Sequence, residues 1–284
     1  MRLLLIGAKG MLGTDMLQEW KSDEVFAADI AEVDIREFEQ VRALVSEVGP
    51  DWIVLTAAYT DVDGSEKNPD LAFGVNATGT ANVARAASEF RARLFYIGTD
   101  YVFDGQSIAP YEASDPVHPL NVYGASKAQG EQAVQHFAGE WCIGRTSWLF
   151  GAHGPSFPEK ILRAAKSRPE LEVVSDQVGS PTFTRDLSKT VLQLMHAEAR
   201  GIVHITNSGV CSWFEFAQEV LHQAGCHTTT VRPVNSAQFP RPARRPAYSV
   251  LSPASLSKYG VTMRNWRLTI PVYLDDLAKA GKRP

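Results

Sequence analysis

The first thirty residues restrict the fold of this chain more than any other stretch. An apolar run from Arg2 to Ile6 leads directly into the turn Gly7-Ala-Lys-Gly10-Met-Leu-Gly13. An amphipathic segment runs from Met11 to Trp20, and a second apolar run, Val25 to Ala28, ends at Asp29. Short apolar runs without alternation are typical of parallel strands that are buried on both faces. The stretch therefore predicts a strand, a tight turn, a helix and a second strand.

This arrangement is suited to binding a dinucleotide. Glycines let the backbone approach a pyrophosphate, and the N-terminus of the helix offers free N–H groups and the positive end of its dipole. Asp29 lies 16 residues after Gly13, where its carboxylate can accept hydrogen bonds from the adenosine ribose. Glycine turns also occur without a ligand, and the spacing G-x-x-G-x-x-G differs from G-x-G-x-x-G. With strand, helix and acid all present, we favour a dinucleotide site over a purely structural turn.

Strands and helices continue to alternate up to Thr146, which predicts an α/β fold with a doubly wound parallel sheet. Further strands are expected at 52–56, 94–97 and 141–144, and helices at 36–48, 68–90 and 121–137. Asp34 is the expected N-cap of the first of these helices. Ligands of such sheets bind beyond the carboxyl ends of the strands. The residues expected to face that crevice are Gly7, Ala57, Thr99 and Arg145.

After Thr146 the regular alternation of strands and helices ends, which predicts a smaller C-terminal lobe. Helices are expected at 158–166, 212–224 and 268–281, and Ser212 with Glu215 forms a capping box at the start of the second. Residues 186–199 and 201–206 are expected to add a helix and a strand to the first sheet. We therefore expect a dinucleotide-binding domain, 1–150 plus about 183–208, that is interleaved with a substrate-binding lobe, about 151–182 and 209–284.

The composition argues against several kinds of protein and of binding partner. Its 284 residues, 44% hydrophobic and 21% charged, are typical of a globular protein of one large or two modest domains. The net charge of −4 gives no reason to expect nucleic acid or an anionic membrane as a partner. No run reaches the roughly 20 apolar residues of a membrane span, and the opening strand leaves no apparent signal peptide. Three scattered cysteines favour reduced thiols and a cytoplasmic location.

Tyr123-Gly-Ala-Ser-Lys127 is the second informative pattern. Residues i and i+4 of a helix share a face, so the phenol and the ammonium should project together. The ammonium should lower the pKa of Tyr123 from about 10 towards neutrality, making it a general acid for carbonyl reduction. A surface helix can carry this pair by chance. Thr99 favours a catalytic role for the pair, because it follows a strand at the same crevice. Its hydroxyl can hydrogen-bond the substrate oxygen there.

These motifs resemble those of the extended short-chain dehydrogenase/reductases. The shared segments are the glycine turn, Ala57-Ala58-Tyr59, Asn76-Ala-Thr-Gly-Thr-Ala-Asn82 and Tyr123-x-x-x-Lys127. Five more selective segments resemble the dTDP-4-dehydrorhamnose reductase family: Thr99-Asp-Tyr-Val-Phe-Asp-Gly105, Pro119-Leu-Asn-Val-Tyr-Gly124, Arg145-Thr-Ser-Trp148, Asp176-Gln-Val-Gly-Ser-Pro-Thr182 and Arg245-Pro-x-x-Ser-x-Leu251. They occur in the family's order through nearly the whole chain. Three positions depart from the pattern: Gly98, where Ser is usual, Tyr248, where Asn is commoner, and Ser252, where Asp is commoner.

The resemblance implies reduction of the C4 ketone of dTDP-4-dehydro-L-rhamnose to dTDP-L-rhamnose. It implies that the nicotinamide delivers hydride to C4 and Tyr123 protonates the oxygen, while Lys127 holds the nicotinamide ribose and Thr99 positions the carbonyl. The residues expected at the cofactor are Gly7, Lys9, Gly10, Met11, Leu12, Gly13, Asp29, Ala57, Ala58, Tyr59, Asn76, Tyr123 and Lys127. The residues expected at the substrate are Thr99, Asp100, Tyr101, Asp104, Trp148, Arg241 and Arg245.

Some of these assignments have alternatives. Asn76 is expected to anchor the site rather than take part in the chemistry. Trp148 packs either against sugar or thymine or in the core, and Asp104 with Gly105 forms either a sugar contact or only a turn. One of three neighbouring arginines is expected to bind the diphosphate, with a solvated loop as the alternative: Arg241, Arg244 or Arg245.

The expected cofactor is NADH or NADPH. Asp29 disfavours the 2′-phosphate of NADPH, which indicates NADH. The resemblance implies that both are accepted, and Lys9 or Arg36 is placed to hold a phosphate.

The expected partner is a small-molecule nucleotide-sugar, and a homodimer is left open. Some relatives bind magnesium at a dimer interface, where Asp15 and Asp186 are the candidates here. Arg185 adds a positive charge beside them, so we expect no metal site. Two alternatives remain: a reductase or epimerase of another nucleotide-sugar, or a non-catalytic nucleotide-binding regulatory subunit. The second arises because the β-subunit of methionine adenosyltransferase is similar to this family.

Overall fold

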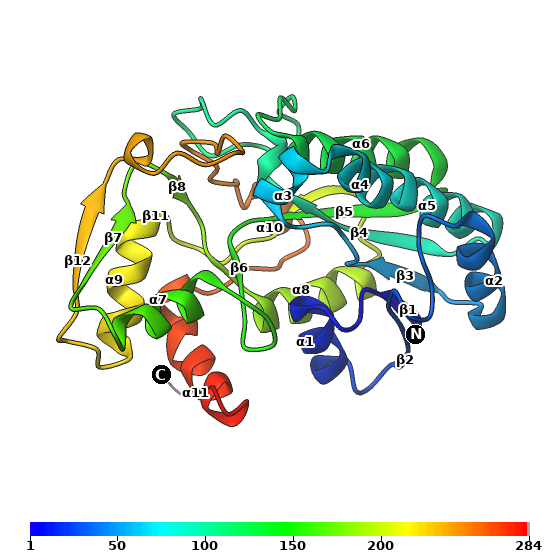
Figure 1. Ribbon diagram of the computed structural model, residues 1–284. Helices are drawn as coiled ribbons and strands as arrows, with labels where there is room; N and C mark the ends of the chain where they lie inside the picture. Colours follow the sequence, from blue (N-terminus) through cyan, green and yellow to red (C-terminus); the bar gives the residue numbers. More distant parts are fainter. Residues whose placement is uncertain (283–284) are drawn as a thin grey trace.

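Six parallel strands form the centre of the structure, a computed structural model that describes residues 1–282 (Figure 1). Their order across the sheet is β10-β5-β4-β3-β1-β2. β2 is added on one side of β1 and β3 on the other, so the order in which strands are added reverses at β1. The strands are β1 (Arg2–Ile6), β2 (Glu24–Ala28), β3 (Trp52–Leu55), β4 (Arg93–Thr99), β5 (Trp141–Thr146) and β10 (Gly201–His204). The doubly wound parallel sheet predicted from the sequence is confirmed.

Both faces of this sheet are buried, which explains the unbroken apolar runs of its strands. Leu4 and Ile6 of β1 point into one hydrophobic cluster, and Leu3 and Leu5 point into another on the opposite face. Figure 1 shows the helices that cover them, one group above the sheet and one below. The upper helices are α2 (Phe38–Val48), α5 (Thr80–Glu89) and α6 (Val122–Phe137), and the lower ones are α1 (Met11–Glu19) and α8 (Thr184–His196).

The chain leaves this sheet after β5 and returns to it through α8 and β10. β10 pairs in parallel with β5, from Gly201 opposite Cys142 to His204 opposite Arg145. Leu187 and Leu194 of α8 are fully buried in the lower cluster. The expected return of this segment to the first sheet is therefore confirmed.

The remaining elements form a smaller lobe with its own hydrophobic cluster, on the left of Figure 1. Its helices are α7 (Phe157–Ala165), α9 (Trp213–Gln223) and α11 (Ile270–Lys279). Its strands pair two by two: β7 (Glu170–Val174) with β12 (Thr230–Val234), β8 (Val178–Gly179) with β11 (Cys211–Ser212), and β6 (Leu149–Phe150) with β9 (Thr182–Phe183). The capping box of Ser212 and Glu215 at the start of α9 is present as predicted.

Short elements complete the chain. They are α3 (Val62–Lys67), α10 (Ala254–Ser257) and the 3-10 turns η2 (Asp100–Val102), η3 (Ser236–Gln238) and η4 (Trp266–Thr269). Leu256 of α10 packs in the cluster below the main sheet. The boundaries of the two domains expected from the sequence stay a prediction.

The prediction of a single helix at 68–90 is wrong in the middle of that segment. The segment forms α4 (Pro69–Phe73), a π-helical turn η1 (Gly74–Gly79) and α5. Within that turn the Asn76 amide donates to the Tyr59 carbonyl and the Ser126 hydroxyl, and its oxygen accepts from the Tyr59 N–H. The wider turn thus coincides with a side chain that joins three segments, which helix periodicity does not reveal.

The expected cap of α2 is also wrong. The helix begins at Phe38, and its N-cap residue, Glu37, makes no side-chain cap hydrogen bond. The Asp34 carboxylate instead accepts from the Arg36 backbone N–H and guanidinium, at 3.0 and 2.9 Å. This local charge-assisted contact occupies the side chain that would otherwise cap the helix.

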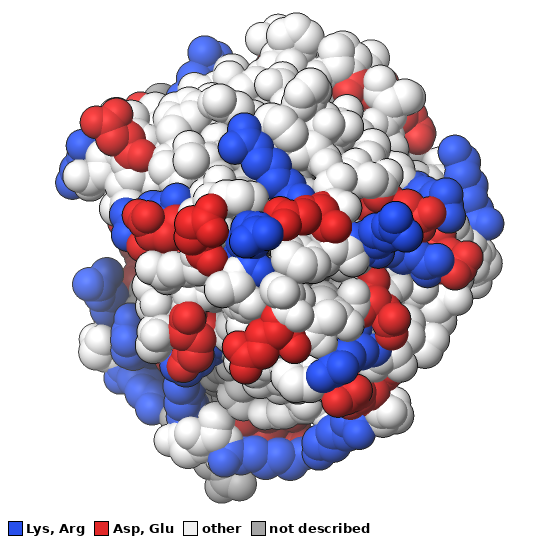
Figure 2. Space-filling view, turned by 90° about the vertical axis from the view of Figure 1, so that its right-hand side faces the viewer, with Lys and Arg blue, Asp and Glu red and all other residues white. Residues whose placement is uncertain are grey.

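The surface mixes charges of both signs. Figure 2 shows a face on which basic and acidic side chains alternate rather than gather by sign. Arg42 pairs with Glu89 at 2.8 Å, and Arg93 pairs with Glu140 at 2.9 Å. All three cysteines are unpaired. No helix within residues 1–282 combines the length and apolar character that a membrane crossing requires.

A buried ion pair ties α6 to β5. The Arg145 guanidinium donates to the Glu131 carboxylate at 2.7–3.2 Å, and both side chains are only 3% exposed. A Cβ on Gly98 would lie 2.9 Å from Glu131 Oε1, so the ion pair fills the space that a side chain at position 98 would need. Arg145 does not line the crevice, and that expectation is wrong because its side chain is bound by Glu131 between β5 and α6.

Arg145→Met should lower the free energy of unfolding by about 3–5 kcal/mol, because it leaves the Glu131 carboxylate buried without a partner. The double variant Glu131→Gln with Arg145→Met removes both charges and should recover most of this loss. Urea unfolding followed by tryptophan fluorescence measures both values. Equal destabilisation in the single and the double variant would contradict the ion-pair interpretation.

Candidate active site

A cleft of about 810 Å³ opens beyond the carboxyl ends of β1, β3 and β4. This is the position where doubly wound sheets bind their ligands. Most of the residues expected at the cofactor and the substrate line this one cleft. They are Gly7, Lys9, Gly10, Met11, Leu12, Gly13, Asp29, Ala57, Ala58, Tyr59, Thr99, Asp100, Tyr101, Tyr123, Lys127 and Trp148.

The glycine turn allows backbone segments to approach each other at the base of the cleft. Gly7 has a φ of +96°, and a Cβ there would lie 2.5 Å from the backbone nitrogen of Ala57. A Cβ on Gly13 would lie 2.3 Å from the Gly7 carbonyl oxygen. Gly10 precedes α1 as its N-cap and offers no side-chain cap. The first N–H groups of α1 are therefore available to a phosphate.

The end of the cleft next to β2 is rich in paired charges. The Asp29 carboxylate accepts from the backbone N–H of Lys9 and of Ile30, at 2.8 and 2.9 Å. The Lys9 ammonium pairs with Glu32 at 3.1 Å. Arg36, the other cation expected to hold a phosphate, is bound by Asp34, and both of these side chains line the cleft. Both cations that face this end are thus already paired with carboxylates.

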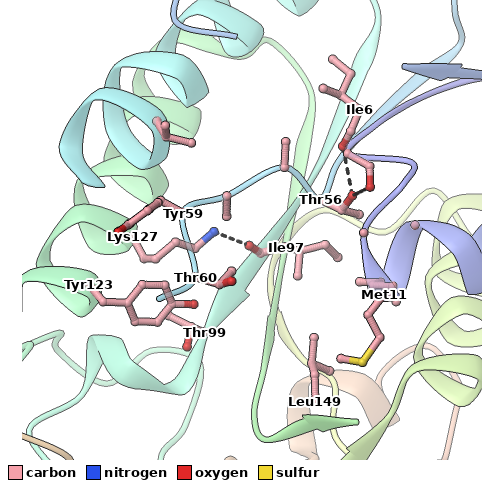
Figure 3. Close-up of a pocket in the computed structure, with 18 of the residues that line it drawn as sticks. Ile6, Met11, Thr56, Tyr59, Thr60, Ile97, Thr99, Tyr123, Lys127 and Leu149 are labelled. Atoms are coloured by element: carbon pink, nitrogen blue, oxygen red, sulfur yellow. Dashed lines mark hydrogen bonds between the residues drawn. The ribbon is translucent and has the colours of Figure 1, made fainter. Parts of the chain in front are cut away.

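Tyr123, Lys127 and Thr99 meet at the centre of the cleft (Figure 3). Asn121 caps α6 by accepting from the Gly124 N–H at 2.7 Å, which sets the start of the helix and the direction of Tyr123. The Thr99 hydroxyl at the end of β4 lies beside the Tyr123 phenol. The Lys127 ammonium donates to the Ile97 carbonyl at 2.7 Å. The three side chains that the sequence singled out are therefore brought together.

The expected lowering of the Tyr123 pKa is wrong in the unliganded cleft. Burial raises the pKa of Tyr123 to about 12, although the neighbouring Thr99 hydroxyl opposes this rise. Burial also lowers the pKa of Lys127 to about 7, against the attraction of Glu131. The desolvation of both groups outweighs the effect of one on the other. Tyr123 therefore keeps its proton at neutral pH.

Trp148, an aromatic residue expected at the substrate, lines the cleft. Trp148 follows β5 with a φ of +48° and stacks on Trp213, with ring centroids 3.5 Å apart and planes 8° apart. A Cβ on Gly179 would lie 2.6 Å from the Trp148 ring. The indole both packs against protein and lines the cleft, so the two alternatives for Trp148 do not exclude each other. Trp213 was recognised only as the start of a helix, because nothing in its local pattern indicates contact with a residue 65 positions earlier.

Four expected site residues do not line the cleft. Asp104 accepts from the Tyr111 hydroxyl at 2.7 Å and precedes Gly105, whose φ of +72° marks a turn. The Arg245 guanidinium is bound by both oxygens of Asp63, at 2.7 and 2.8 Å. Arg241 is exposed, and Asn76 is buried behind Tyr59.

The residues considered for a metal are occupied by other partners. Asp15 accepts a short hydrogen bond from Thr184, and Asp186 is bound by Arg264 at 2.8 Å. Arg185 pairs with Glu19 and Asp276 at 2.7 and 2.9 Å. Within residues 1–282 no group of three or more His, Cys, Asp or Glu side chains is placed to hold a metal ion.

Several cleft residues were missed by sequence reasoning. They include Thr56, Thr60, Val75, Ile97, Thr146, Ser147 and Leu149. Leu149 and Met11 lie across the cavity from Tyr123 (Figure 3). Thr56 and Ile97 end predicted strands and Thr146 follows one by two residues, which was the available signal, but nothing in their local sequence distinguished them from other strand-end residues.

Gly7→Ala should lower the free energy of unfolding by about 3 kcal/mol or more, because it adds a backbone collision to the strain of a positive φ. It should also weaken NADH binding at least tenfold. Gly49→Ala is the matched control, since Gly49 has a φ of +55° and open space around a Cβ. That variant should lose only about 1 kcal/mol and keep its NADH affinity. Urea unfolding and NADH fluorescence titration measure these effects, and similar losses in the two variants would contradict them.

Lys127→Met should stabilise the unliganded protein most at low pH. Below pH 7 both the folded and the unfolded chain carry the Lys127 charge, so the cost of burying it is present in full. Between pH 7 and 10.5 only the unfolded chain keeps the proton, so the parent gains stability as the pH rises. The advantage of Lys127→Met should therefore be larger at pH 6 than at pH 9 in urea unfolding. The exposed Lys160→Met is the control, and a pH-independent advantage of Lys127→Met would contradict the burial cost.

Known proteins are similar to this chain over nearly its whole length. Residues 1–279 match the family model described as RmlD substrate binding domain. The spore coat polysaccharide biosynthesis protein SpsK of Bacillus subtilis is 37% identical over 98% of this chain and 99% of its own length. The dTDP-4-dehydrorhamnose reductase of Mycobacterium tuberculosis is 39% identical over 96% of this chain and 92% of its own length.

Solved structures of similar sequence have the same fold. The dTDP-4-dehydrorhamnose reductase of Bacillus anthracis, solved in complex with NADP, has a TM-score of 0.94 and 38% identity over 97% of this chain and 99% of its own. The corresponding protein of Clostridium acetobutylicum has a TM-score of 0.95 and 37% identity over 98% of this chain and 100% of its own. The chain therefore belongs to the dTDP-4-dehydrorhamnose reductase family, NAD(P)-dependent nucleotide-sugar reductases of the extended short-chain dehydrogenase/reductase type.

Proposed function

We propose that this protein reduces the C4 ketone of dTDP-4-dehydro-L-rhamnose to dTDP-L-rhamnose. The observation that carries the proposal is the convergence of the Tyr123 phenol, the Thr99 hydroxyl and the Lys127 side chain in the cleft that begins at the glycine turn. The M. tuberculosis relative carries the name of this activity. The three cysteines, all unpaired, favour a reducing compartment and the cytoplasmic location that we propose with it.

A bound NADH or NADPH would supply the hydride. The protein would orient the ketone and supply the proton. Tyr123 gives its proton to the oxygen as negative charge develops there, and Thr99 donates a hydrogen bond to the same oxygen. A protonated Lys127 would stabilise the phenolate that is left. Ser126 and Asn76 hold α6 against the segment of Tyr59, which keeps these groups in register.

The substrate end suits a sugar nucleotide. The Trp148 indole, held in place by its stack on Trp213, lines the cleft and offers an apolar contact for a sugar or a thymine. Arg241 is exposed near the pair of Arg245 and Asp63, and we propose it as the partner of the diphosphate. Of the three departures from the family pattern, Tyr248 and Ser252 do not line the cleft, whereas Gly98 does. The name of the B. subtilis relative refers to spore coat polysaccharide, so another nucleotide-sugar is the second candidate substrate.

We propose that NADH is preferred over NADPH. The Asp29 carboxylate is held towards the cleft by two backbone N–H groups, where it can accept from a ribose hydroxyl but repels a phosphate. Lys9 and Arg36 are paired with Glu32 and Asp34, so neither cation is free to bind a 2′-phosphate without losing its partner. NADPH can bind when its 2′-phosphate replaces the carboxylate partner of Lys9 or of Arg36, which breaks one of these exposed ion pairs.

Tyr123→Phe should keep NADH affinity and lower kcat about 100-fold or more, because it removes only the proton donor. Oxidation of NADH and NADPH is followed with dTDP-4-dehydro-L-rhamnose and, in parallel, with GDP- and UDP-linked keto-sugars. Tyr259→Phe is the control, since the Tyr259 hydroxyl bonds the Arg200 backbone outside the cleft. Parental activity in Tyr123→Phe would overturn the acid assignment. A parent that binds NADH but reduces none of the keto-sugars would instead be a regulatory nucleotide-binding protein.

Asp34→Asn should lower the KM for NADPH several-fold and leave the KM for NADH unchanged, because it releases Arg36 to bind the 2′-phosphate. The ratio of kcat/KM for the two cofactors measures the shift. In the double variant Asp34→Asn with Arg36→Met the gain should disappear. A persistent gain there would show that the acid acts by its own charge and not through Arg36.

A further inference from the structure

The carboxyl group of Asp100 is buried at the substrate end of the cleft. Asp100 is the first residue of η2, directly after β4, and only 1% of it is exposed. Its Oδ1 accepts from the Thr99 hydroxyl at 3.2 Å. Its Oδ2 has no hydrogen-bond partner among residues 1–282, although Asp100 is part of the cleft lining. Such an oxygen is costly to bury, which points to a role in the reaction or in binding.

Thr99 connects this carboxyl group to the proton donor. Its hydroxyl contacts Asp100 on one side and lies beside the Tyr123 phenol on the other. The backbone N–H of Tyr101 donates to the same hydroxyl at 3.2 Å and fixes its position. We propose, on the basis of the reductase function proposed above, that Asp100 stores the proton that restores Tyr123, with Thr99 as the relay.

The surroundings of Asp100 allow it to hold a proton near neutral pH. Burial raises its pKa to about 7, against the effect of nearby hydroxyls from Thr99 and Ser249. The titratable groups that face it are two phenols, Tyr101 on its own turn and Tyr123 on α6, and each adds only a charge that would further disfavour the carboxylate. Burial raises the pKa of Tyr101, and the charge of Arg245 opposes this rise.

The proton transfers balance without a further reactant. Hydride adds to the ketone carbon and the Tyr123 O–H bond breaks as its proton joins the ketone oxygen. When Asp100 is protonated, its carboxyl O–H donates to the Thr99 oxygen, and the Thr99 hydroxyl turns its own hydrogen from Oδ1 towards the Tyr123 oxygen. The Thr99 proton then moves to the phenolate as the Asp100 carboxyl proton moves to the Thr99 oxygen. Asp100 is left as a carboxylate and takes a proton from water once the alcohol leaves the cleft. One hydride and one proton are consumed for each ketone reduced.

Asp100→Asn tests the relay, because the amide keeps the size of the side chain but cannot supply an acid proton. We expect kcat to fall tenfold or more, while the KM for the keto-sugar and the affinity for NADH stay within twofold. We expect kcat of the parent to fall as the pH rises above 7, because Asp100 then loses its proton, and we expect this ionisation to be absent from the pH profile of Asp100→Asn. Asp15→Asn is the matched control: Asp15 is also buried, its pKa is raised by burial, and it accepts from Thr184, but it lies outside the cleft lining.

A double variant tests whether the groups act in series. Thr99→Val breaks the relay, so adding Asp100→Asn to it should cause no further loss of kcat, whereas Thr99→Ser should keep most of the parental rate. Independent, multiplicative losses would overturn the relay. A rise in KM with unchanged kcat in Asp100→Asn would also overturn it and make Oδ2 an acceptor for a substrate hydroxyl.

The reductase proposal and the relay proposal fail in different ways. If the parent reduces no keto-sugar, the proposed function is wrong, and the relay that rests on it is overturned as well. If the parent is active and Asp100→Asn has the parental kcat and pH profile, only the relay is wrong. Thermal unfolding of each variant identifies a loss of rate that comes from a loss of fold.

Discussion

The attachment of α6 to the main sheet is the interaction on which the candidate active site depends. Tyr123, Lys127 and Glu131 follow one another at intervals of four, so they lie along one face of the helix. Lys127 is held by the Ile97 carbonyl at the end of β4, and Glu131 is held by Arg145 of β5. Both contacts fix the rotation of the helix, which directs Tyr123 towards the cleft. Gly98 makes room for this arrangement, since a Cβ there would collide with Glu131.

Burial at this helix has an electrostatic cost. A cation whose pKa falls to about 7 and a phenol whose pKa rises to about 12 are both disfavoured in their charged forms. The fold therefore holds both groups in a desolvated environment that favours their neutral forms, at a cost in stability. Such sites are a common exception to the rule that buried groups are placed for stability.

The two ends of the cleft use different chemistry. Next to β2, carboxylates and cations are paired and backbone N–H groups hold Asp29 in place. Elsewhere in the cleft wall lies Trp148, from the segment after β5, which stacks on Trp213 of α9 in the smaller lobe. A ligand that spans the cleft would contact the glycine turn and Trp148 together. This division fits a dinucleotide and a sugar nucleotide that meet at Tyr123.

Local sequence determined the elements of this fold and most of the cleft. Apolar runs, the glycine turn, the Tyr123–Lys127 spacing and the capping box at Ser212 are each encoded within a few residues, so β1, α6 and α9 were predictable. The π-helical turn at Asn76 and the burial of Arg145 were not, because each depends on partners from distant segments. The cap of α2 was missed for a local reason, since Arg36 competes with the helix N-terminus for the Asp34 carboxylate. Trp213 and Arg245 show the same dependence, since their partners lie 65 and 182 positions away. Ionisation was decided only by the tertiary structure: the expected effect of Lys127 on Tyr123 assumed a solvated pair, whereas packing removed the water that would have stabilised either charge.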